Sequence, residues 1–257
     1  AEQGYASAQF NLGVCYKNGK GVEQDDVEAV RWFGAPADQG NEMAQCNLGF
    51  CYENGKGVDQ DDEEAVRWYQ AAADQGYAVA QFNLGLCYEH GKGVEQDDEE
   101  AVRWYRAAAD QGHAGAQGNL GLCYDNGKGV EQDDVEAVRW YRAAAEQGDA
   151  GAQFNLGFCY ENGTGVEQND VEAVRWWRAA ADQGHAGAQC NLGVFYRNGA
   201  GVKQDDVAAV RWVRAAAEQG NAGAQFNLGA MHYNGNGMLV DYAAAAKWWK
   251  LAADQGQ

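Results

Sequence analysis

The chain has 257 residues and a formal net charge of -19, with 38 acidic against 19 basic side chains. Binding to phosphate backbones depends on clustered cations that release counterions, so this balance argues against nucleic acids and anionic membranes as partners. The sequence holds no run of about 18 consecutive apolar residues and therefore predicts no membrane span.

The triplet Asn-Leu-Gly recurs through the whole chain at a constant spacing of 36 residues. It begins at Asn11, Asn47, Asn83, Asn119, Asn155, Asn191 and Asn227. A fixed period between about 20 and 50 residues is typical of solenoids and propellers, in which stacked units bury a shared core. We therefore expect a single repeat domain over residues 1–257, with units that begin near residues 5, 41, 77, 113, 149, 185 and 221. The opening AEQG matches the end of a unit, so residues 1–4 are expected to close a preceding, truncated unit of a longer protein.

The first half of each unit has the apolar spacing of a helix. In the first unit one helix face, at about 100° per residue, carries Ala8, Leu12, Cys15 and Tyr16. Gly13 lies beside this face, and a glycine inside a helix costs about 1 kcal/mol against alanine. Because every unit repeats this glycine, we interpret it as the point where a second helix approaches closely. An Asn-Gly or His-Gly pair then predicts a left-handed helix end.

The second half of each unit begins with an acidic cap and continues as another helix. Asp25, with Glu28 three residues later, resembles a capping box, and acidic side chains favour the positive end of the helix dipole. One tryptophan per unit is the expected apolar anchor, namely Trp32, Trp68, Trp104, Trp140, Trp176, Trp212 and Trp248. Pro36 replaces an alanine of this helix in the first unit, and a proline inside a helix is expected to kink it or to cost about 3 kcal/mol.

The seven cysteines are not spaced as a disulfide framework. Five occupy the same place in successive units: Cys15, Cys51, Cys87, Cys123 and Cys159. Equivalent residues of neighbouring units should lie about 9 Å or more apart, whereas a disulfide needs Cα atoms within about 7 Å. The remaining two stand where other units have phenylalanine. We therefore expect reduced, mostly buried thiols, and a reducing, cytoplasmic compartment rather than secretion.

The combined pattern AxxxLGxxYxxGxGVxxDxxxAxxWxxxAAxxG covers essentially the whole chain and resembles the Sel-one-like repeat family, relatives of the tetratricopeptide repeats. The resemblance implies an all-α fold, a right-handed α-solenoid (superhelix) of seven 36-residue helix-turn-helix repeats. It also implies that the first helix of each unit lines the concave side of the superhelix.

Two sets of side chains on the first helices are the candidate partner-binding residues of this concave groove. A solvated helix face should be polar, yet this face carries the large apolar residues Phe50, Leu86, Leu122 and Phe158. A further row of the same face holds Phe10, Phe82, Phe154 and Phe226. The seven asparagines would form a ladder beside them, because amides at regular spacing can pair with the backbone of an extended peptide. In the alternative interpretation, each asparagine bonds to its own array and the apolar side chains fill space between units.

Catalytic signals are weak in this sequence. It has one serine, Ser7, and one threonine, Thr164, which argues against a serine nucleophile repeated in each unit. Cys87 and His90 lie three residues apart and could pair as thiolate and base, but a histidine in a turn is more often structural. We predict no catalytic residues, no metal and no cofactor.

These features favour a non-catalytic scaffold that binds a peptide or protein partner in the concave groove. Its acidic rims would favour a basic partner and raise the association rate. One alternative is a β-lactam-hydrolysing or penicillin-binding enzyme, since some cysteine-rich members of the family are associated with that chemistry, although their paired cysteines are absent here. Another is a self-associating array, because apolar stacking faces are uncovered at residues 1–20 and at Trp248, Trp249 and Leu251.

Overall fold

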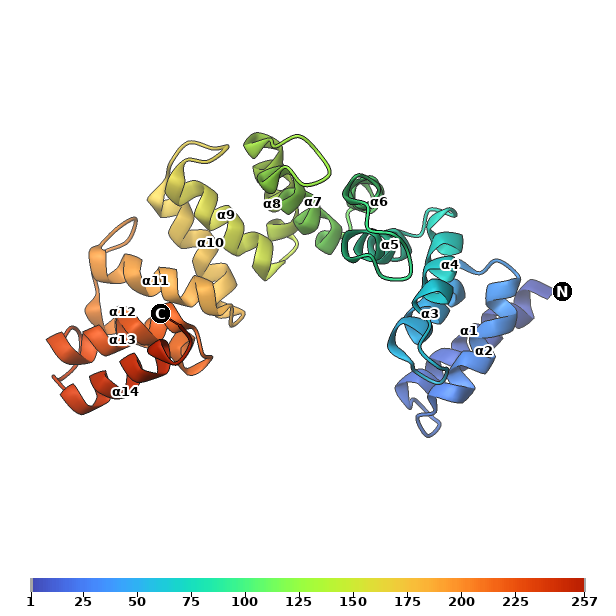
Figure 1. The fold of residues 1–257 in the computed structure, drawn as a ribbon, viewed down its shortest axis with the longest axis horizontal. Coiled ribbons are helices and arrows are strands. Elements are labelled where there is room, and N and C mark those ends of the chain that lie inside the picture. The colour runs from blue at the N-terminus through green and yellow to red at the C-terminus, as the bar shows by residue number, and fades with distance from the viewer. Residues whose placement is uncertain (1, 257) are drawn as a thin grey trace. The chain divides into compact units, whose positions relative to one another are not determined.

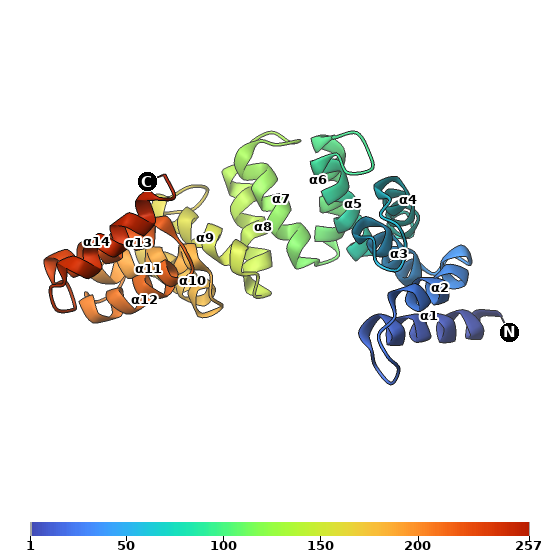
Figure 2. The same ribbon diagram turned by 60° about the horizontal axis from the view of Figure 1, so that its bottom comes forward.

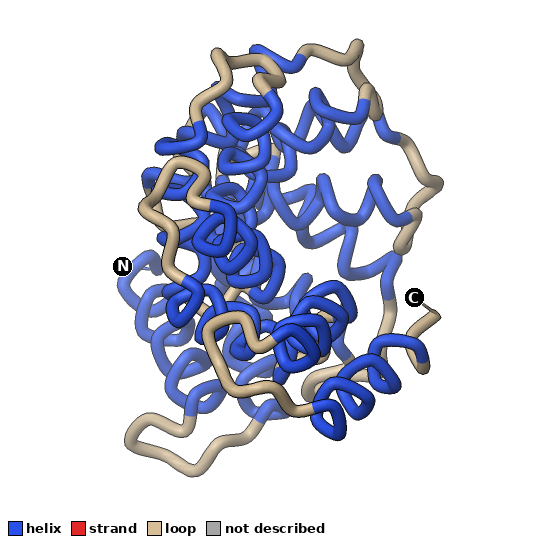
Figure 3. Tube along the Cα trace, turned by 90° about the vertical axis from the view of Figure 1, so that its left-hand side faces the viewer, coloured by secondary structure: helices blue, strands red, loops and turns tan. Residues whose placement is uncertain are grey.

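The computed structural model describes residues 2–256. Every regular element in this range is an α-helix and none is a strand, as the blue helices of Figure 3 show. The chain forms two compact units, Ala1–Gln132 and Asp133–Gln257, and each is described by itself. These two units are much larger than the 36-residue sequence units, which are called repeats below. None of the helices in residues 2–256 is both long enough and apolar enough to cross a membrane.

Both units are built from antiparallel helix pairs. Among the described residues, the first unit contains α1 (Glu2–Asn18), α2 (Asp26–Asp38), α3 (Glu42–Asn54), α4 (Asp62–Ala73), α5 (Ala78–His90), α6 (Asp98–Asp110) and α7 (Ala114–Asn126) (Figure 1). The second contains α8 (Asp134–Glu146), α9 (Ala150–Asn162), α10 (Asp170–Asp182), α11 (Ala186–Asn198), α12 (Asp206–Glu218), α13 (Ala222–Asn234) and α14 (Tyr242–Ala253). Within each unit, each helix packs against its neighbours in sequence, so that α9 and α10, for example, lie side by side (Figure 2). The predicted all-α class of helix-turn-helix repeats is confirmed.

The helix ends follow the predicted capping chemistry. Asp133 caps α8, where its side chain accepts hydrogen bonds from the backbone N–H groups of Val135 and Glu136. At the C-terminal end of α9, a first helix, Gly163 adopts the left-handed conformation with a φ of 70° and caps the helix. The same two devices recur along the chain, so the loop inside each hairpin begins and ends at equivalent residues.

The deepest side chain of most hairpins follows the tryptophan in sequence. The expected tryptophan anchors are buried in the middle of the chain, Trp104 to 6% exposure and Trp176 to 9%, but the residues after them, Tyr105 and Trp177, are 0% exposed. Gly157 lies directly against the latter: a Cβ on this glycine would meet the Trp177 ring at 2.6 Å. The glycine inside the first helix is therefore the point of close helix approach that the sequence predicts.

From the second repeat on, the second glycine of the GxG turn has a role that the sequence did not reveal. Gly201 has a φ of 60°, and a Cβ there would lie 2.2 Å from the backbone oxygen of Asp170. The loop before α12 is thus pressed against the start of α10, the second helix of the preceding hairpin. Neighbouring hairpins are held together by their loops as well as by their helices.

Pro36 lies inside α2, which continues unbroken to Asp38. The helix ends only two residues later, and the Pro36 carbonyl accepts a hydrogen bond from the backbone N–H of Asn41 at 3.0 Å. The break expected at a proline is therefore absent, although Pro36 cannot donate the backbone hydrogen bond of its position.

Candidate functional site

The candidate partner-binding residues all lie on the first helices of the hairpins. Within each unit, neighbouring first helices come together at this row. In the first unit, Nδ2 of Asn83 on α5 lies 3.9 Å from Sγ of Cys46 on α3. In the second, Nδ2 of Asn227 on α13 lies 3.8 Å from Sγ of Cys190 on α11. At these two positions an asparagine therefore contacts a cysteine of the preceding first helix.

Two further asparagines, besides Asn83 and Asn227, are occupied by hydrogen bonds inside the protein. The Nζ atom of Lys17 donates to Oδ1 of Asn47 at 2.7 Å, and Nδ2 of Asn47 donates to the carbonyl of Met43 at 2.8 Å. The Asn119 amide is bonded to the hydroxyl of Tyr105. At these positions the structure matches the alternative interpretation, in which the asparagine bonds to its own array.

Other asparagines retain free hydrogen-bonding capacity. Asn155 and Asn191 are half-buried on α9 and α11, and neither side chain has a hydrogen-bond partner within the described residues. Asn11 is exposed on α1 and is likewise unpaired there. A half-buried amide without a partner is ready to bind the backbone of another chain.

The four apolar candidates differ in exposure. Leu122 on α7 is 41% exposed and Phe158 on α9 is 52% exposed, whereas Leu86 and Phe50 are half-buried. Phe158 follows Asn155 by three residues, so the two share one helix face. Phe50 is flanked by cations, with the Nζ atoms of Lys17 and Lys56 at 4.6 Å and 5.1 Å from its ring centre.

The phenylalanine row that begins at Phe10 packs partly into the next hairpin. Phe82 stacks on His113 with ring centres 4.7 Å apart, and Phe154 stacks on His185 at 4.6 Å. Only Phe226 on α13 is largely exposed, at 58%. The expectation that this row lines a groove is corrected for Phe82 and Phe154, because their rings are used between hairpins.

The two stacked histidines have structural roles. The Nδ1 atom of His113 accepts a hydrogen bond from the backbone N–H of Ala116 at 3.2 Å, and His185 caps α11 through Ala188 at 3.1 Å. Burial lowers the pKa of both imidazoles below the ordinary value. Both therefore favour the neutral form that the cap requires.

A ladder of buried glutamines connects successive hairpins, and sequence reasoning missed it. Six glutamines are buried: Gln45, Gln81, Gln117, Gln153, Gln189 and Gln225. Nε2 of Gln189, for example, donates to the carbonyl of Ala181 at 3.1 Å, and its Oε1 accepts from Nε2 of Gln219 at 2.7 Å. The signal was present, because a polar residue recurred every 36 residues beside the buried alanines.

The pair Cys87 and His90 lacks an activated nucleophile. Burial raises the pKa of the Cys87 thiol to about 12, and burial raises that of Cys46 and Cys123 to about 11. Thiols with such pKa values are protonated at neutral pH and react poorly. Within residues 2–256 no group of three or more His, Cys, Asp or Glu side chains is arranged to hold a metal ion.

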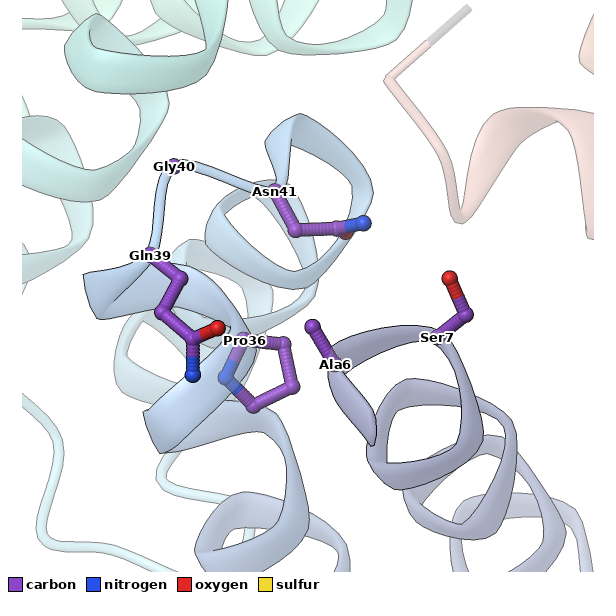
Figure 4. A pocket seen from close by; sticks show the side chains of 6 residues that line it. All are labelled: Ala6, Ser7, Pro36, Gln39, Gly40 and Asn41. Atoms are coloured by element: carbon purple, nitrogen blue, oxygen red, sulfur yellow. The ribbon is translucent and has the colours of Figure 1, made fainter. Parts of the chain in front are cut away.

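A hollow of about 330 Å³ lies in the first unit between α1, the end of α2 and the start of α3 (Figure 4). Its lining residues are Ala6, Ser7, Pro36, Gln39, Gly40 and Asn41. The lone serine of the chain thus lies at this hollow, but none of the lining side chains is a histidine or a carboxylate that could activate it.

Comparison with known proteins gives the same repeat length. The Sel1 repeat family matches residues 6–41, 42–77, 78–113, 114–149, 150–185, 186–221 and 222–257. A search of the curated proteins gave no match.

Two of the solved structures that match over the whole chain are Sel1-type repeat proteins. A protective antigen of uropathogenic Escherichia coli with an SLR fold is 38% identical with a TM-score of 0.92, and the match covers 100% of this chain and 55% of the antigen. A Sel1 repeat protein from Oxalobacter formigenes is 39% identical with a TM-score of 0.79, over 100% of this chain and 74% of that protein. An immunity protein from Pseudomonas aeruginosa shares the fold at 21% identity and a TM-score of 0.51, over 84% of this chain and 83% of its own. This chain therefore spans little more than half the length of the antigen.

Proposed function

Because this chain belongs to the Sel1 repeat family, we propose that it is a non-catalytic scaffold whose first helices bind an extended peptide segment of a protein partner. Sel1 repeats are a protein-interaction fold. The observation that carries the proposal is the pairing, on α9, of the unpartnered amide of Asn155 with the 52% exposed ring of Phe158. A free amide beside an exposed aromatic ring suits a ligand that offers both a backbone and an apolar side chain.

The two kinds of side chain have separate tasks in this proposal. The free amides of Asn11, Asn155 and Asn191 bind the peptide backbone, which makes binding tolerant of sequence. Phe158 and Leu122 contact apolar side chains of the partner and provide most of the affinity, as buried aromatic and aliphatic anchors do in other interfaces. Asn47, Asn83, Asn119 and Asn227, which bond or contact other parts of the chain, contribute less.

The charge of the chain favours a basic partner. With 38 acidic and 19 basic side chains, the protein attracts cations over a distance of about one Debye length, roughly 8 Å at physiological salt. Attraction of this kind raises the association rate and weakens as salt is added. Lys17 and Lys56 beside Phe50 are a local exception, so that position is less suited to a basic side chain.

A peptide library displayed on phage and selected against the wild-type protein tests this function. Peptides recovered in the selection are measured against the double variant Asn155→Ala with Asn191→Ala, and against Phe158→Ser. We expect each variant to bind roughly tenfold more weakly, since hot-spot truncations cost more than about 1 kcal/mol. Arg139→Gln on α8, a second helix, is the control and should bind as the wild type does. Equal binding by all variants would remove the first helices from the function.

Self-association is a second candidate, which exposed side chains of α14 favour. Tyr242 is 64% exposed and Leu251 is 47% exposed, while Trp248 and Trp249 are half-buried. These side chains occupy the helix that would meet a further repeat, so another copy could stack there. Sedimentation velocity over a hundredfold concentration range separates the two candidates, because a constant monomeric coefficient excludes stacking.

A further inference from the structure

Each second helix carries a basic side chain at the same position. In the first five repeats this side chain forms an ion pair with a glutamate, and in the last two repeats the glutamate is missing. In five repeats an arginine forms an ion pair with a glutamate three residues earlier, namely Arg31, Arg67, Arg103, Arg139 and Arg175. In the sixth repeat Arg211 is preceded by Ala208 in place of the glutamate, and in the seventh Lys247 is preceded by Ala244. Arg211 has no ion pair within the described residues; its guanidinium lies 4.8 Å from the ring centre of Trp212.

A second arginine, one turn further along the helix, also loses its partner in the sixth repeat. Arg142 donates to the hydroxyl of Tyr160 at 2.8 Å, and Arg178 donates to the hydroxyl of Tyr196. The residue equivalent to these tyrosines for Arg214 is His232, and the exposed guanidinium of Arg214 has no hydrogen bond within the described residues. The sixth repeat therefore presents two uncommitted arginines one turn apart on α12.

These arginines border an apolar depression of about 460 Å³ between α12 and the loop before α14. Its lining residues are Val207, Val210, Arg211, Arg214, Ala215, Glu218, Gly237 and Met238. A similar depression of about 350 Å³ lies one repeat earlier, with Val171, Val174, Val202 and two arginines around it. There, however, both arginines are held by Glu172 and Tyr196, so the two depressions differ mainly in the availability of their cations.

The charge of the surrounding chain also changes at this place. Residues 199–257 contain five acidic and five basic side chains, whereas residues 1–198 contain 33 acidic and 14 basic ones. The whole net charge of -19 therefore lies before residue 199. An anionic ligand is repelled by most of the chain but not by its last two repeats.

We propose that the depression on α12 binds a peptide segment of a partner in which a carboxylate lies beside an aliphatic or aromatic side chain. The valines and Met238 take the apolar side chain, and burial of its surface contributes most of the binding. The guanidinium groups of Arg211 and Arg214 bind the carboxylate through charge-assisted hydrogen bonds. Glu218 on the same rim requires the carboxylate to approach from the arginine side.

A peptide suits this site better than the other anionic macromolecules. Duplex DNA needs a long track of cations, and the acidic first 198 residues cannot supply it. An anionic membrane needs several basic side chains around a broad apolar surface, whereas this depression holds one or two side chains. The proposal does not depend on the binding surface of the first helices, which lies on other helices.

Fluorescence anisotropy with a labelled acetyl-Leu-Glu-Leu-Glu-Leu-amide peptide tests the proposal directly. We expect saturable binding that weakens with salt, and an affinity roughly tenfold lower for the peptide with glutamine in place of glutamate. A peptide with alanine in place of leucine should also bind more weakly. The absence of binding by the glutamate peptide at millimolar concentration, or equal affinity for the glutamine peptide, would overturn the proposal.

The variant Ala208→Glu provides the sharpest test in the protein, because it restores a residue that five other repeats contain and should fold normally. The new glutamate pairs with Arg211, and we expect roughly tenfold weaker binding of the acidic peptide. Arg211→Gln with Arg214→Gln should have the same effect. The matched control, Arg175→Gln with Arg178→Gln, changes the equivalent arginines one repeat earlier and should leave the affinity unchanged.

Three outcomes with these variants would contradict the assignment. The first is peptide binding that survives Ala208→Glu and the double variant of Arg211 and Arg214. The second is equal loss in the control pair at Arg175 and Arg178, which would indicate a general charge effect. The third is stronger binding to phosphatidylserine vesicles or to a 20-base-pair DNA duplex than to the peptide. Phe158→Ser should not alter binding of the acidic peptide, so failure here and failure of the proposed function are distinguishable.

Discussion

The Nε2 atom of Gln183, at the C-terminal cap of α10, donates a hydrogen bond to Oε1 of Gln153 on α9 at 2.8 Å, between two side chains of the fifth repeat that are 30 residues apart. Gln153 in turn donates from its own Nε2 to the carbonyl of Ala145 at 3.0 Å, at the end of α8. One buried side chain thus connects three helices, and it leaves neither half of its amide unpaired. The same arrangement recurs in both units, so the repeats are joined by hydrogen bonds inside an otherwise apolar stack.

Replacing Gln153 by alanine should therefore destabilise the protein. The change removes the hydrogen bonds that Gln153 makes to Ala145 and Gln183 and opens a small cavity, while the carbonyl of Ala145 keeps its bond from the backbone N–H of Gly148 at 3.0 Å. We expect a loss of about 1 to 3 kcal/mol. Urea denaturation followed by circular dichroism measures the free energy of unfolding. Gln70→Ala is the control, because Gln70 bonds only to exposed Asp74 on the same helix and should change stability by less than about 0.5 kcal/mol. If both variants lose the same free energy of unfolding, the buried glutamines do not stabilise the protein more than an exposed glutamine does.

Gly157→Ala should also destabilise the protein, against the usual preference for alanine in helices. Alanine is favoured over glycine by about 1 kcal/mol in a helix interior, but the new Cβ would meet the Trp177 ring at 2.6 Å. The ring is fully buried and cannot move freely, so overpacking should cost about 1 to 3 kcal/mol. After the gain from helix propensity is subtracted, we expect a net loss of up to about 2 kcal/mol. Thermal denaturation compares this variant with the wild type.

Gly223→Ala on α13 is the matched control for Gly157. The nearest atom to a Cβ at Gly223 is Oδ1 of Asn221, at an ordinary 3.5 Å, and other repeats have Met43 or Val79 at this position. Here propensity should win, with a gain of about 0.5 to 1 kcal/mol. A stabilising effect at both glycines would show that the first helix does not need close approach at Gly157.

The repeat period made most of the fold predictable from the sequence. Because the pattern occurs seven times, the positions that stay the same are the ones that the fold requires. The helix ends, the packing glycine and the alanines could therefore be recognised in the sequence. The glutamine ladder was missed because a polar residue on a helix is normally assigned to the surface, and only the structure shows that Gln153 finds two partners inside. The second glycine of the turn, such as Gly201, could be explained from the sequence by the tight turn alone. In the structure it also makes room for the backbone of Asp170.

The candidate site could be predicted less well than the fold. The candidate residues lie on the first helices that the sequence predicts, but the partners of single side chains depend on differences between the repeats. Asn47 is occupied because the first repeat has Lys17 where the next two have Glu53 and Glu89, and this lysine reaches the Asn47 amide. On α12, Arg211 is free because Ala208 replaces a glutamate, and Arg214 is free because His232 replaces a tyrosine. From the sequence alone it is hard to decide which of these single substitutions alters a hydrogen bond or ion pair, because the sequence does not show which residues face each other.

The stacked histidines predict a loss of stability in mild acid. Since burial lowers the pKa of His113 and His185 in the folded protein, protonation is easier after unfolding. Their contribution is present above the unfolded pKa of about 6.5 and is lost as the pH falls through the folded value. Urea midpoints should therefore decrease as the pH is lowered from about 7.5 to about 5.5, a range in which ordinary carboxylates titrate little.

Replacing both histidines by asparagine should reduce this pH dependence. Asparagine caps α3 and α13 at the equivalent positions, Asn41 and Asn221, so the double variant retains helix caps and loses the titrating groups. His90→Asn is the control, since His90 is exposed at a turn where other repeats have asparagine. An unchanged slope of stability against pH in the double variant would assign the effect to other groups.

Glu161 lacks both partners that stabilise its counterparts, and this leads to the last prediction. In the second repeat, Glu53 accepts a hydrogen bond from the Tyr69 hydroxyl at 2.8 Å and lies 3.8 Å from the Nζ atom of Lys92. In the fifth repeat the tyrosine is replaced by Trp177, and the lysine of the following turn by Ala200. Burial, together with the negative charge of Asp170, raises the pKa of the Glu161 carboxyl above its ordinary value.

Ala200→Lys should therefore stabilise the protein at neutral pH. The new lysine occupies the place of Lys128, whose Nζ atom lies 3.2 Å from Glu89 and 3.3 Å from Asp98, and should lower the pKa of Glu161. In the wild type the raised pKa means that the Glu161 contribution is present at low pH and lost as the pH rises through the folded value. In the variant the lowered pKa gives a contribution that is present at neutral pH and lost on acidification.

The difference in stability between Ala200→Lys and the wild type should consequently grow from about pH 4 to about pH 7, towards roughly 0.5 to 1 kcal/mol for a partly exposed pair. Urea denaturation at several pH values measures it, and carbon NMR of the Glu161 carboxyl follows the pKa directly. Because the chain carries a charge of -19, any added lysine reduces general repulsion. Gln168→Lys, in an exposed loop of the fifth repeat, corrects for that effect, and Ala200→Gln for the longer side chain. If Gln168→Lys stabilises as much as Ala200→Lys, the gain comes from net charge and not from the missing partner of Glu161.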